Sequence, residues 1–173
     1  MNDPAREVRI RPMTIADLEQ VLEIAGNSTD APGWPRSAYL QALDPHSTPR
    51  RIALVATGPK QKEIRGFLIA VLTPPDAELE SIAVAPALQR CGIGRHLLQG
   101  FVGELTREAI QKLYLEVRSS NAAALSLYRA AGFIRCGVRP DYYADPVEDA
   151  VLMELRLGHG CQSKTRVGVP FSS

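Results

Sequence analysis

Two stretches of the sequence decide the fold: LESIAVAPALQRCGIGRHLL at residues 79–98 and YLEVRSSNAAALSLYRAAGF at residues 114–133. In the first, a β-rich run passes through a turn with two glycines into a helical pattern. Such a junction leaves backbone N–H groups without partners and carries the partial positive charge of the helix dipole. In the second, Glu116 lies on a predicted strand and Tyr128 on the helix that follows. The two stretches therefore predict an anion site beside a carboxylate and a phenol.

Outward from these stretches, predicted strands alternate with predicted helices. The strands cover residues 8–12, 51–57, 64–72, 78–84, 113–118, 133–139 and 147–157, and the helices cover 15–25 (with Thr14 as N-cap), 37–43, 92–109 and 122–131. Residues 58–63 are expected to form a hairpin turn and residues 140–145 a loop. This order predicts one α/β domain over residues 1–157, with a mixed central sheet of about seven strands flanked by helices. A loose tail rich in Gly and Ser is expected at 158–173.

Composition and charge exclude several classes of protein. The 173 residues carry 20 Lys and Arg against 19 Asp and Glu, which argues against a general nucleic-acid-binding protein. The longest purely apolar run, Phe67 to Leu72, is too short to span a bilayer, and the N-terminus has no signal-peptide pattern. Three cysteines (Cys91, Cys136 and Cys161) and three histidines match no disulfide framework or metal-ligand spacing. We therefore expect a cytoplasmic protein without a metal or membrane partner, and the sequence leaves its oligomeric state open.

The glycine turn QRCGIGR at residues 89–95 matches neither a P-loop nor a dinucleotide-binding fingerprint. It lacks the Lys-Ser/Thr pair of the first, and no glycine stands three residues after Gly94 as the second requires. Glycine lets phosphate oxygens approach the backbone, and Arg90 and Arg95 offer charge-assisted hydrogen bonds. Taken alone, the pattern fits a turn that merely needs glycine equally well. No histidine base lies near Cys91 in sequence, so we interpret this cysteine as a turn residue rather than a nucleophile.

Taken together, LESIAV, QRxGIG, the helix after it and LEVRSSNAAALSLYxxxGF resemble the GNAT acyltransferases, and among them the RimI-type N-terminal acetyltransferases. The resemblance covers residues 8–157 and implies a single-domain GNAT fold with acetyl-coenzyme A as the acetyl donor. One strand would pair with the pantetheine arm, and the glycine turn would bind the pyrophosphate. The residues implied for the coenzyme are Ile82, Ala83, Val84, Arg90, Cys91, Gly92, Ile93, Gly94, Arg95 and Asn121. Cys91 departs from the basic or polar residue that the family often has there.

The resemblance also implies which residues move protons. Glu116 would accept the proton of the acceptor amine through water, and Tyr128 would protonate the coenzyme sulfur, because a phenol with a pKa near 10 is protonated at neutral pH. Each residue also has an ordinary structural interpretation: an ion pair for Glu116, a core aromatic for Tyr128 and a helix N-cap for Asn121. We favour the functional roles because the residues occur in this order beside the glycine turn.

The expected acceptor is the N-terminal amine of a protein, acetylated by direct transfer in a ternary complex. An α-amine with a pKa of about 7.7–8.0 costs about 1–1.4 kcal/mol to deprotonate at pH 7, whereas a lysine costs about 4.6 kcal/mol. One carboxylate acting through water therefore suits the α-amine better. The alternatives are the same fold acting on a lysine side chain or a small-molecule amine, or a non-catalytic acyl-coenzyme A sensor.

Aromatic residues are expected to line the acceptor groove, between a loop at residues 31–36 and a loop at residues 141–145. Tyr142 and Tyr143 match the family's paired tyrosines, and Trp34 matches its tryptophan, although the family has Pro-Trp-Ser where this chain has Gly-Trp-Pro. Amphipathic aromatics of this kind suit the walls of a peptide groove. Trp34 fits a hydrophobic plug over the early helices equally well. For the RimI-type group the resemblance implies a ribosomal-protein N-terminus as acceptor, often beginning with alanine.

Overall fold

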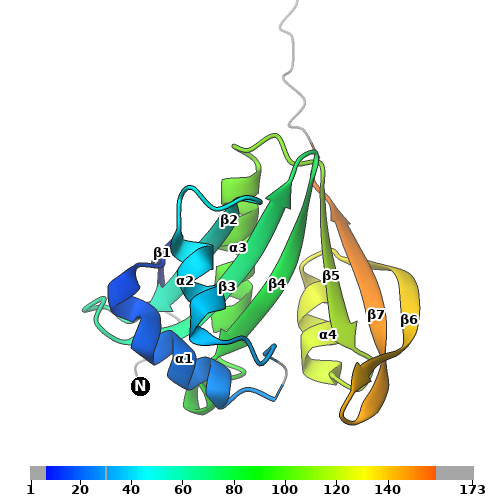
Figure 1. Ribbon diagram of the computed structural model, residues 1–173, viewed down its shortest axis with the longest axis horizontal. Helices are drawn as coiled ribbons and strands as arrows, with labels where there is room; N and C mark the ends of the chain where they lie inside the picture. Colours follow the sequence, from blue (N-terminus) through cyan, green and yellow to red (C-terminus); the bar gives the residue numbers. More distant parts are fainter. Residues whose placement is uncertain (1–6, 30, 159–173) are drawn as a thin grey trace, which may run out of the picture.

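The computed structural model describes residues 7–29 and 31–158 and contains one mixed sheet with helices on both faces (Figure 1). Its strands are β1 (Arg9–Pro12), β2 (Arg51–Thr57), β3 (Ile64–Thr73), β4 (Asp76–Val84), β5 (Lys112–Arg118), β6 (Ile134–Ala144) and β7 (Val147–Arg156). Its α-helices are α1 (Leu18–Gly26), α2 (Arg36–Leu43), α3 (Ile93–Leu105) and α4 (Ala122–Ala130). The predicted α/β class and the mixed seven-strand sheet are confirmed. Apart from Gly158, the predicted tail lies outside the described residues.

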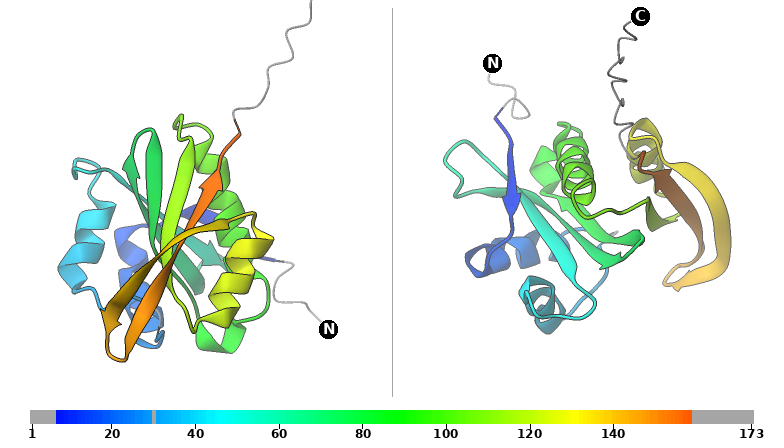
Figure 2. Two further views of the ribbon diagram at one scale, coloured as in Figure 1. Left: turned by 90° about the vertical axis from the view of Figure 1, so that its right-hand side faces the viewer. Right: turned by 90° about the horizontal axis from the view of Figure 1, so that it is seen from above.

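The sheet has the order β1-β2-β3-β4-β5-β7-β6, and only its central pair, β4 with β5, is parallel. Helices α1 and α2 lie on one face and α3 and α4 on the other, as the view from above shows (Figure 2). Successive side chains of β3 point to opposite faces of the sheet. Phe67 and Ile69 belong to the core under α1 and α2, and Leu68 and Ala70 belong to the core on the face of α3 and α4. Each face therefore has its own apolar core.

The parallel pairing of β4 with β5 is short. It runs from Asp76, opposite Lys112, to Leu79, opposite Leu115, and ends there. Glu80 is the next residue of β4, and it forms a β-bulge, because Leu79 and Ser81 pair with consecutive residues of β3. Beyond the bulge the two strands diverge (Figure 1). Residues 81–84 stay paired with β3, so the edge of β4 that faces β5 is left open.

Helix α3 is shorter than predicted, ending at Leu105 instead of Ala109. The hydroxyl of Thr106 donates to the Gly103 carbonyl at 2.8 Å, and three-residue backbone bonds tighten the chain after it. Ala109 then takes a positive φ of 55°, and Ile110 turns back into the core at 3% exposure. The burial of Ile110 explains why the helical pattern does not continue.

The predicted loop at residues 140–145 is wrong, because β6 continues through it to Ala144. A bulge lies between Arg139 and Tyr143, where Pro140 has no N–H to give to a sheet ladder. Asp141 has a φ of 51°, and its N–H donates to the Asp149 carboxylate at 2.9 Å. A side chain of β7 thus replaces a backbone partner, so the paired tyrosines stand on a strand.

The start of α1 agrees with its predicted cap. A short 3-10 turn at Ile15–Asp17 precedes the helix, with Thr14 as N-cap. The backbone N–H and the hydroxyl of Thr14 both donate to Asp17, at 2.8 and 3.0 Å. The same carboxylate accepts two bonds of 2.7 Å from Arg11 of β1, which ties the helix start to the sheet edge.

Candidate active site

A groove of about 430 Å³ opens where β4 and β5 diverge. Its walls come from β4, from the turn before α3, from β5 and α4, and from single residues after α1 and on β6. The predicted site residues that line it are Ile82, Ala83, Val84, Arg90, Gly92, Ile93, Gly94, Arg95, Glu116, Asn121, Tyr128 and Tyr143. Cys91, Trp34 and Tyr142 are not among its lining residues. The groove thus brings together most of the residues predicted from two distant stretches of sequence.

One end of the groove is built from the start of α3. Gly92 is the N-cap and has a left-handed φ of 82°, a conformation that favours glycine. Within the described part of the chain, the backbone N–H groups of Gly92 to Arg95 donate to no acceptor, as expected for a first helical turn. Arg90 and Arg95 are exposed and form no ion pair with a described residue. Unpaired amides, the helix dipole and two arginines together suit a polyanion.

Gly94 serves packing between helices. A Cβ built there would lie 3.2 Å from Cδ2 of Leu127 on α4 and 4.0 Å from Cγ2 of Val84 on β4. The missing side chain therefore lets α3 and α4 approach each other behind the groove. Cys91 is half-buried in the turn between Arg90 and Gly92, and its thiol has no disulfide partner among the described residues.

Glu116 lies on the face of the sheet covered by α1 and α2, because its neighbours Leu115 and Val117 pack into the opposite core. Its carboxylate is 16% exposed and forms an ion pair with Arg139 of β6, with 3.1 Å between Oε1 and Nε. The Glu116 carboxylate beside the Tyr142 hydroxyl raises the pKa of Tyr142. The ion pair anticipated by the structural interpretation is therefore present, and Tyr142 reaches the site through Glu116.

Two further carboxylates lie near Glu116 on β4. Glu80 lines the groove and receives both Nε and Nη2 of Arg51, at 2.7 and 3.0 Å. Glu78 forms no ion pair with a described residue. Loss of solvation and the negative charges of Glu116 and Glu80 raise the pKa of Glu78. This side of the groove is thus rich in negative charge.

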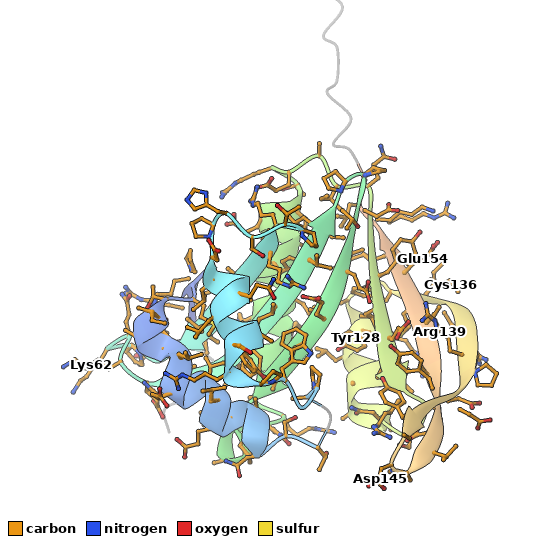
Figure 3. The ribbon with its side chains drawn as sticks, viewed as in Figure 1. Lys62, Tyr128, Cys136, Arg139, Asp145 and Glu154 are labelled. Atoms are coloured by element: carbon orange, nitrogen blue, oxygen red, sulfur yellow. The ribbon has the colours of Figure 1, made fainter. Side chains whose placement is uncertain are left out.

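Tyr128 comes from α4 and lines the groove from the other face of the sheet; its side chain is seen in the opening between β4 and β5 (Figure 3). It is 5% exposed, and its ring packs against Phe133 at 5.6 Å between centroids. Asn121 caps α4, since its Oδ1 accepts from the Ala124 N–H at 2.9 Å. The predicted structural interpretations of Tyr128 and Asn121 are thus present, and both residues border the groove as well.

The aromatic residues predicted for the acceptor groove separate in the structure. Tyr143 lines the groove, and the Arg118 guanidinium lies 4.1 Å from its ring centroid. Trp34 packs edge-on against Tyr39 at 5.6 Å and joins the core under α1 and α2. The plug interpretation of Trp34 therefore describes its contacts, because burial of Tyr39 against Phe67 draws the tryptophan toward that core.

The turn that precedes α4 is held by a carboxylate of β7. Glu148 accepts from the Ser120 N–H, from the Ser119 hydroxyl and from Arg118, and these bonds, led by that of Ser120, lower the pKa of Glu148 to about 2. Arg118 also reaches the carbonyls of Asp145 and Pro146 at the tip of the β6–β7 hairpin. This network fixes Asn121 and Tyr143 relative to each other.

Some residues of the groove have no signal that the sequence analysis used. Ser81 is 5% exposed, lines the groove, and its hydroxyl has no hydrogen-bond partner among the described residues. The sequence signal that could have indicated Ser81 is its position as a polar residue at the start of the apolar run SIAV. Ser28, after α1, also lines the groove. Arg139 pairs with Glu116 without lining the groove, and strand alternation could not find it because a bulge between Arg135 and Gly137 breaks the two-residue period before it.

Among residues 7–29 and 31–158, no helix is long and apolar enough to cross a membrane. Within the same residues, no three His, Cys, Asp or Glu side chains gather into a set that could hold a metal ion.

Comparisons with known proteins agree with this geometry. Residues 18–133 match the model of the acetyltransferase (GNAT) family. The [ribosomal protein bS18]-alanine N-acetyltransferase of Escherichia coli (strain K12) is 42% identical over 97 residues, which cover 55% of this chain and 66% of that protein. The N-alpha-acetyltransferase RimI of Mycobacterium tuberculosis is 35% identical over 162 residues, covering 91% of this chain and 98% of that protein. The crystal structure of the ribosomal-protein-S18-alanine N-acetyltransferase from Escherichia coli matches with a TM-score of 0.77 and 30% identity, over 90% of this chain and 97% of that chain.

Proposed function

Because this chain belongs to the acetyltransferase (GNAT) family, we propose that it is a protein N-α-acetyltransferase, transferring acetyl from acetyl-coenzyme A to a protein N-terminus. One observation carries the proposal. A single groove joins the unpaired amides at the start of α3, the Glu116 carboxylate and the Tyr128 phenol. These are an anion-binding end, a proton acceptor and a proton donor, which is what acyl transfer from a phosphorylated carrier to an amine requires.

The coenzyme would lie along the open edge of β4. The N–H groups of Gly92 to Arg95, with the Arg90 and Arg95 side chains, would hold its pyrophosphate. The unpaired backbone edge of residues 82–84 would pair with the pantetheine amides, as an added strand pairs with a sheet edge. The Asn121 side chain uses its oxygen as a cap, so its Nδ2 amide would donate to the pantetheine. The coenzyme supplies the thioester, an activated acetyl group.

The two proton transfers fall to residues on opposite faces of the sheet. As the amine nitrogen bonds to the acetyl carbon and the carbon–sulfur bond breaks, the amine loses one proton, which Glu116 accepts through water. Tyr128 gives its phenolic proton to the departing sulfur, and solvent then returns a proton from Glu116 to Tyr128. The divergence of β4 and β5 is what lets the two side chains act on one bond.

The acceptor would approach from the face that carries Glu116, with Tyr142 and Tyr143 beside its first residues. Trp34 is left out of this part of the proposal because it does not line the groove and packs, half-buried, against the core under α1 and α2. The names of the relatives from Escherichia coli and Mycobacterium tuberculosis support an N-terminal amine, and the former supports a ribosomal protein that begins with alanine. Such an acceptor would place the reaction in the cytoplasm.

Incubation with acetyl-coenzyme A and a peptide that begins with alanine tests the proposal, with the product followed by mass spectrometry. The free peptide should gain one acetyl group, and the same peptide with a blocked N-terminus and an internal lysine should gain none. Tyr128→Phe should lose most of the turnover, whereas Tyr114→Phe, which removes a phenol of β5 that does not line the groove, should keep it. Full activity of Tyr128→Phe would remove the donor role.

Two other outcomes would replace the proposal. Acetylation of the blocked peptide or of a polyamine would make the chain a lysine or small-molecule acetyltransferase. Coenzyme binding by calorimetry without turnover of any amine would make it an acyl-coenzyme A sensor.

A further inference from the structure

Three carboxylates lie together on the face of the sheet that carries Glu116. Glu78 and Glu80 come from β4, and Glu116 comes from the neighbouring β5, where the strands begin to diverge. Arg51 neutralises Glu80 through two hydrogen bonds, and Arg139 neutralises Glu116 at 3.1 Å. Glu78 has no ion pair with a described residue. Of the two cations, Arg139 alone reaches the proposed proton acceptor.

Arg139 reaches Glu116 across an intervening strand. It lies on β6, and β7 separates β6 from β5, with Leu152 of β7 opposite Glu116. The Arg139 guanidinium also lies 5.5 Å from the Tyr142 ring centroid, and the Glu116 carboxylate beside the Tyr142 hydroxyl raises the pKa of Tyr142. Arg139 thus contacts the carboxylate directly and also packs against a second residue that lies beside it.

The bulge in β6 makes this arrangement possible. Residues three apart on a regular strand point to opposite faces, so Arg139 and Tyr142 would not share a partner. Pro140 and Asp141 are accommodated in a bulge, with the Asp141 N–H held by Asp149. The irregularity turns Tyr142 back toward the side that Arg139 occupies. The local departure from strand geometry therefore has a use at the site.

We propose that Arg139 is a positioning residue that keeps the Glu116 carboxylate oriented and ionised beside two other carboxylates; this inference rests on the proposed function. Without Arg139, Glu116 would face the negative charge of Glu78 on the neighbouring strand with no cation paired to it, and a nearby like charge favours the protonated form of a carboxyl group. A protonated Glu116 cannot accept the proton of the acceptor amine. Below the pH at which the acceptor amine itself becomes protonated, Arg139 therefore extends the range in which Glu116 can accept a proton.

The charged and titratable groups around Glu116 leave this role to Arg139. They are Glu78 and Glu80 on β4, Arg51 on β2, Tyr114 and Arg118 on β5 itself, Arg139, Tyr142 and Tyr143 on β6, Glu148 and Glu154 on β7, and Tyr128 on α4. Arg51 is taken by Glu80, and Arg118 by Glu148 and the hairpin tip. Among these groups, Arg139 is the cation that pairs with Glu116.

The test compares Arg139→Gln with Arg139→Lys and with the matched control Arg135→Gln. Arg135 is an exposed arginine of the same strand without an ion pair to a described residue, so its loss changes net charge equally. In the pH profile of kcat/KM for the alanine peptide, the inflection below that of the amine itself should move up by about half to one pH unit in Arg139→Gln, a figure kept modest because Arg139 is 56% exposed. Arg139→Lys should recover most of the wild-type profile, and Arg135→Gln should keep it.

A double variant and a readout without substrate complete the design. Adding Glu78→Gln to Arg139→Gln removes the competing carboxylate, so the inflection should move back toward wild type. The Glu116 carboxyl is also followed by carbon-13 NMR, with Glu116→Gln identifying its signal; its midpoint should move up in Arg139→Gln alone. Equal behaviour of Arg139→Gln and Arg135→Gln in both readouts, or a slower enzyme with unmoved midpoints, overturns the inference. If wild-type protein acetylates no amine, the proposed function fails, and the NMR midpoints still decide whether Arg139 keeps Glu116 ionised.

Discussion

Gly92 offers a prediction whose size follows from one backbone angle. It is the N-cap of α3 with a φ of 82°, a conformation that costs a residue with a Cβ about 1–2 kcal/mol. If Gly92→Ala keeps this turn, the strain lowers the free energy of unfolding by that amount. For a chain of this length the melting temperature should then fall by about 2–8 °C. The melting temperature of Gly92→Asn should lie between those of Gly92→Ala and wild type, because asparagine tolerates the left-handed region better than alanine does.

The turn of Gly92→Ala can also relax, and the loss then appears in binding. If the turn adopts an unstrained conformation without ligand, it must return to the left-handed conformation to bind the pyrophosphate. The same 1–2 kcal/mol then weakens coenzyme A binding by about 5- to 30-fold. Thermal unfolding by circular dichroism and calorimetric titration with coenzyme A measure the two effects on the same samples. Their sum, not either one alone, is the predicted quantity.

Gly103 provides the control for this experiment. It lies in the exposed interior of α3, and a Cβ there would meet nothing within 4 Å. Gly103→Ala should therefore raise stability by about 0.5–1 kcal/mol through helix propensity and leave coenzyme binding unchanged. A Gly92→Ala protein that matches wild type in both melting temperature and coenzyme affinity would refute the reasoning.

Two further predictions concern the core and the sheet edge. Tyr39→Phe should raise the free energy of unfolding in urea by about 1 kcal/mol, because the Tyr39 hydroxyl is buried with no partner among the described residues; a lower value would mean that the hydroxyl is satisfied. Asp17→Asn should cost about 1.5–3 kcal/mol at pH 7, since the carboxylate binds Arg11 and Thr14, and these bonds hold its pKa below the ordinary value of 3.8. A carboxylate with a lowered pKa stabilises the fold above its unfolded value and loses this effect as pH falls through the folded one, so urea titrations of variant and wild type should converge below pH 4. A difference in the free energy of unfolding that stays constant with pH would contradict this role of the ionised Asp17 carboxylate.

Sequence patterns predicted the elements whose signals are local. Strand β2 and the hairpin before β3 are observed where alternation and turn residues placed them, and α4 is capped by Asn121 and ends before Gly132. The glycine turn could be recognised because a helix cap with a left-handed backbone favours glycine, and the two glycines at the start of the helix are visible in the sequence. Glu116 and Tyr128 meet in one groove because strand and helix periods fix their faces.

The errors arose where distant contacts override local composition. PDYYAD has the residues of a turn, yet β6 continues through it because the Asp149 side chain supplies a partner that no local pattern reveals. The end of α3 depends on the burial of Ile110. Arg139 meets Glu116 across another strand, a relation that only the folded sheet creates.

The short parallel pairing of β4 with β5 has a mechanical consequence. Four residue pairs, from Asp76–Lys112 to Leu79–Leu115, are the seam between the two halves of the sheet. The half formed by β1 to β4 and the half formed by β5 to β7 are therefore joined directly at one end of β4 and β5 and are not paired at the other. A ligand bound between β4 and β5 bridges the two halves where they are not paired, so substrate occupancy and the rigidity of the whole domain should rise together.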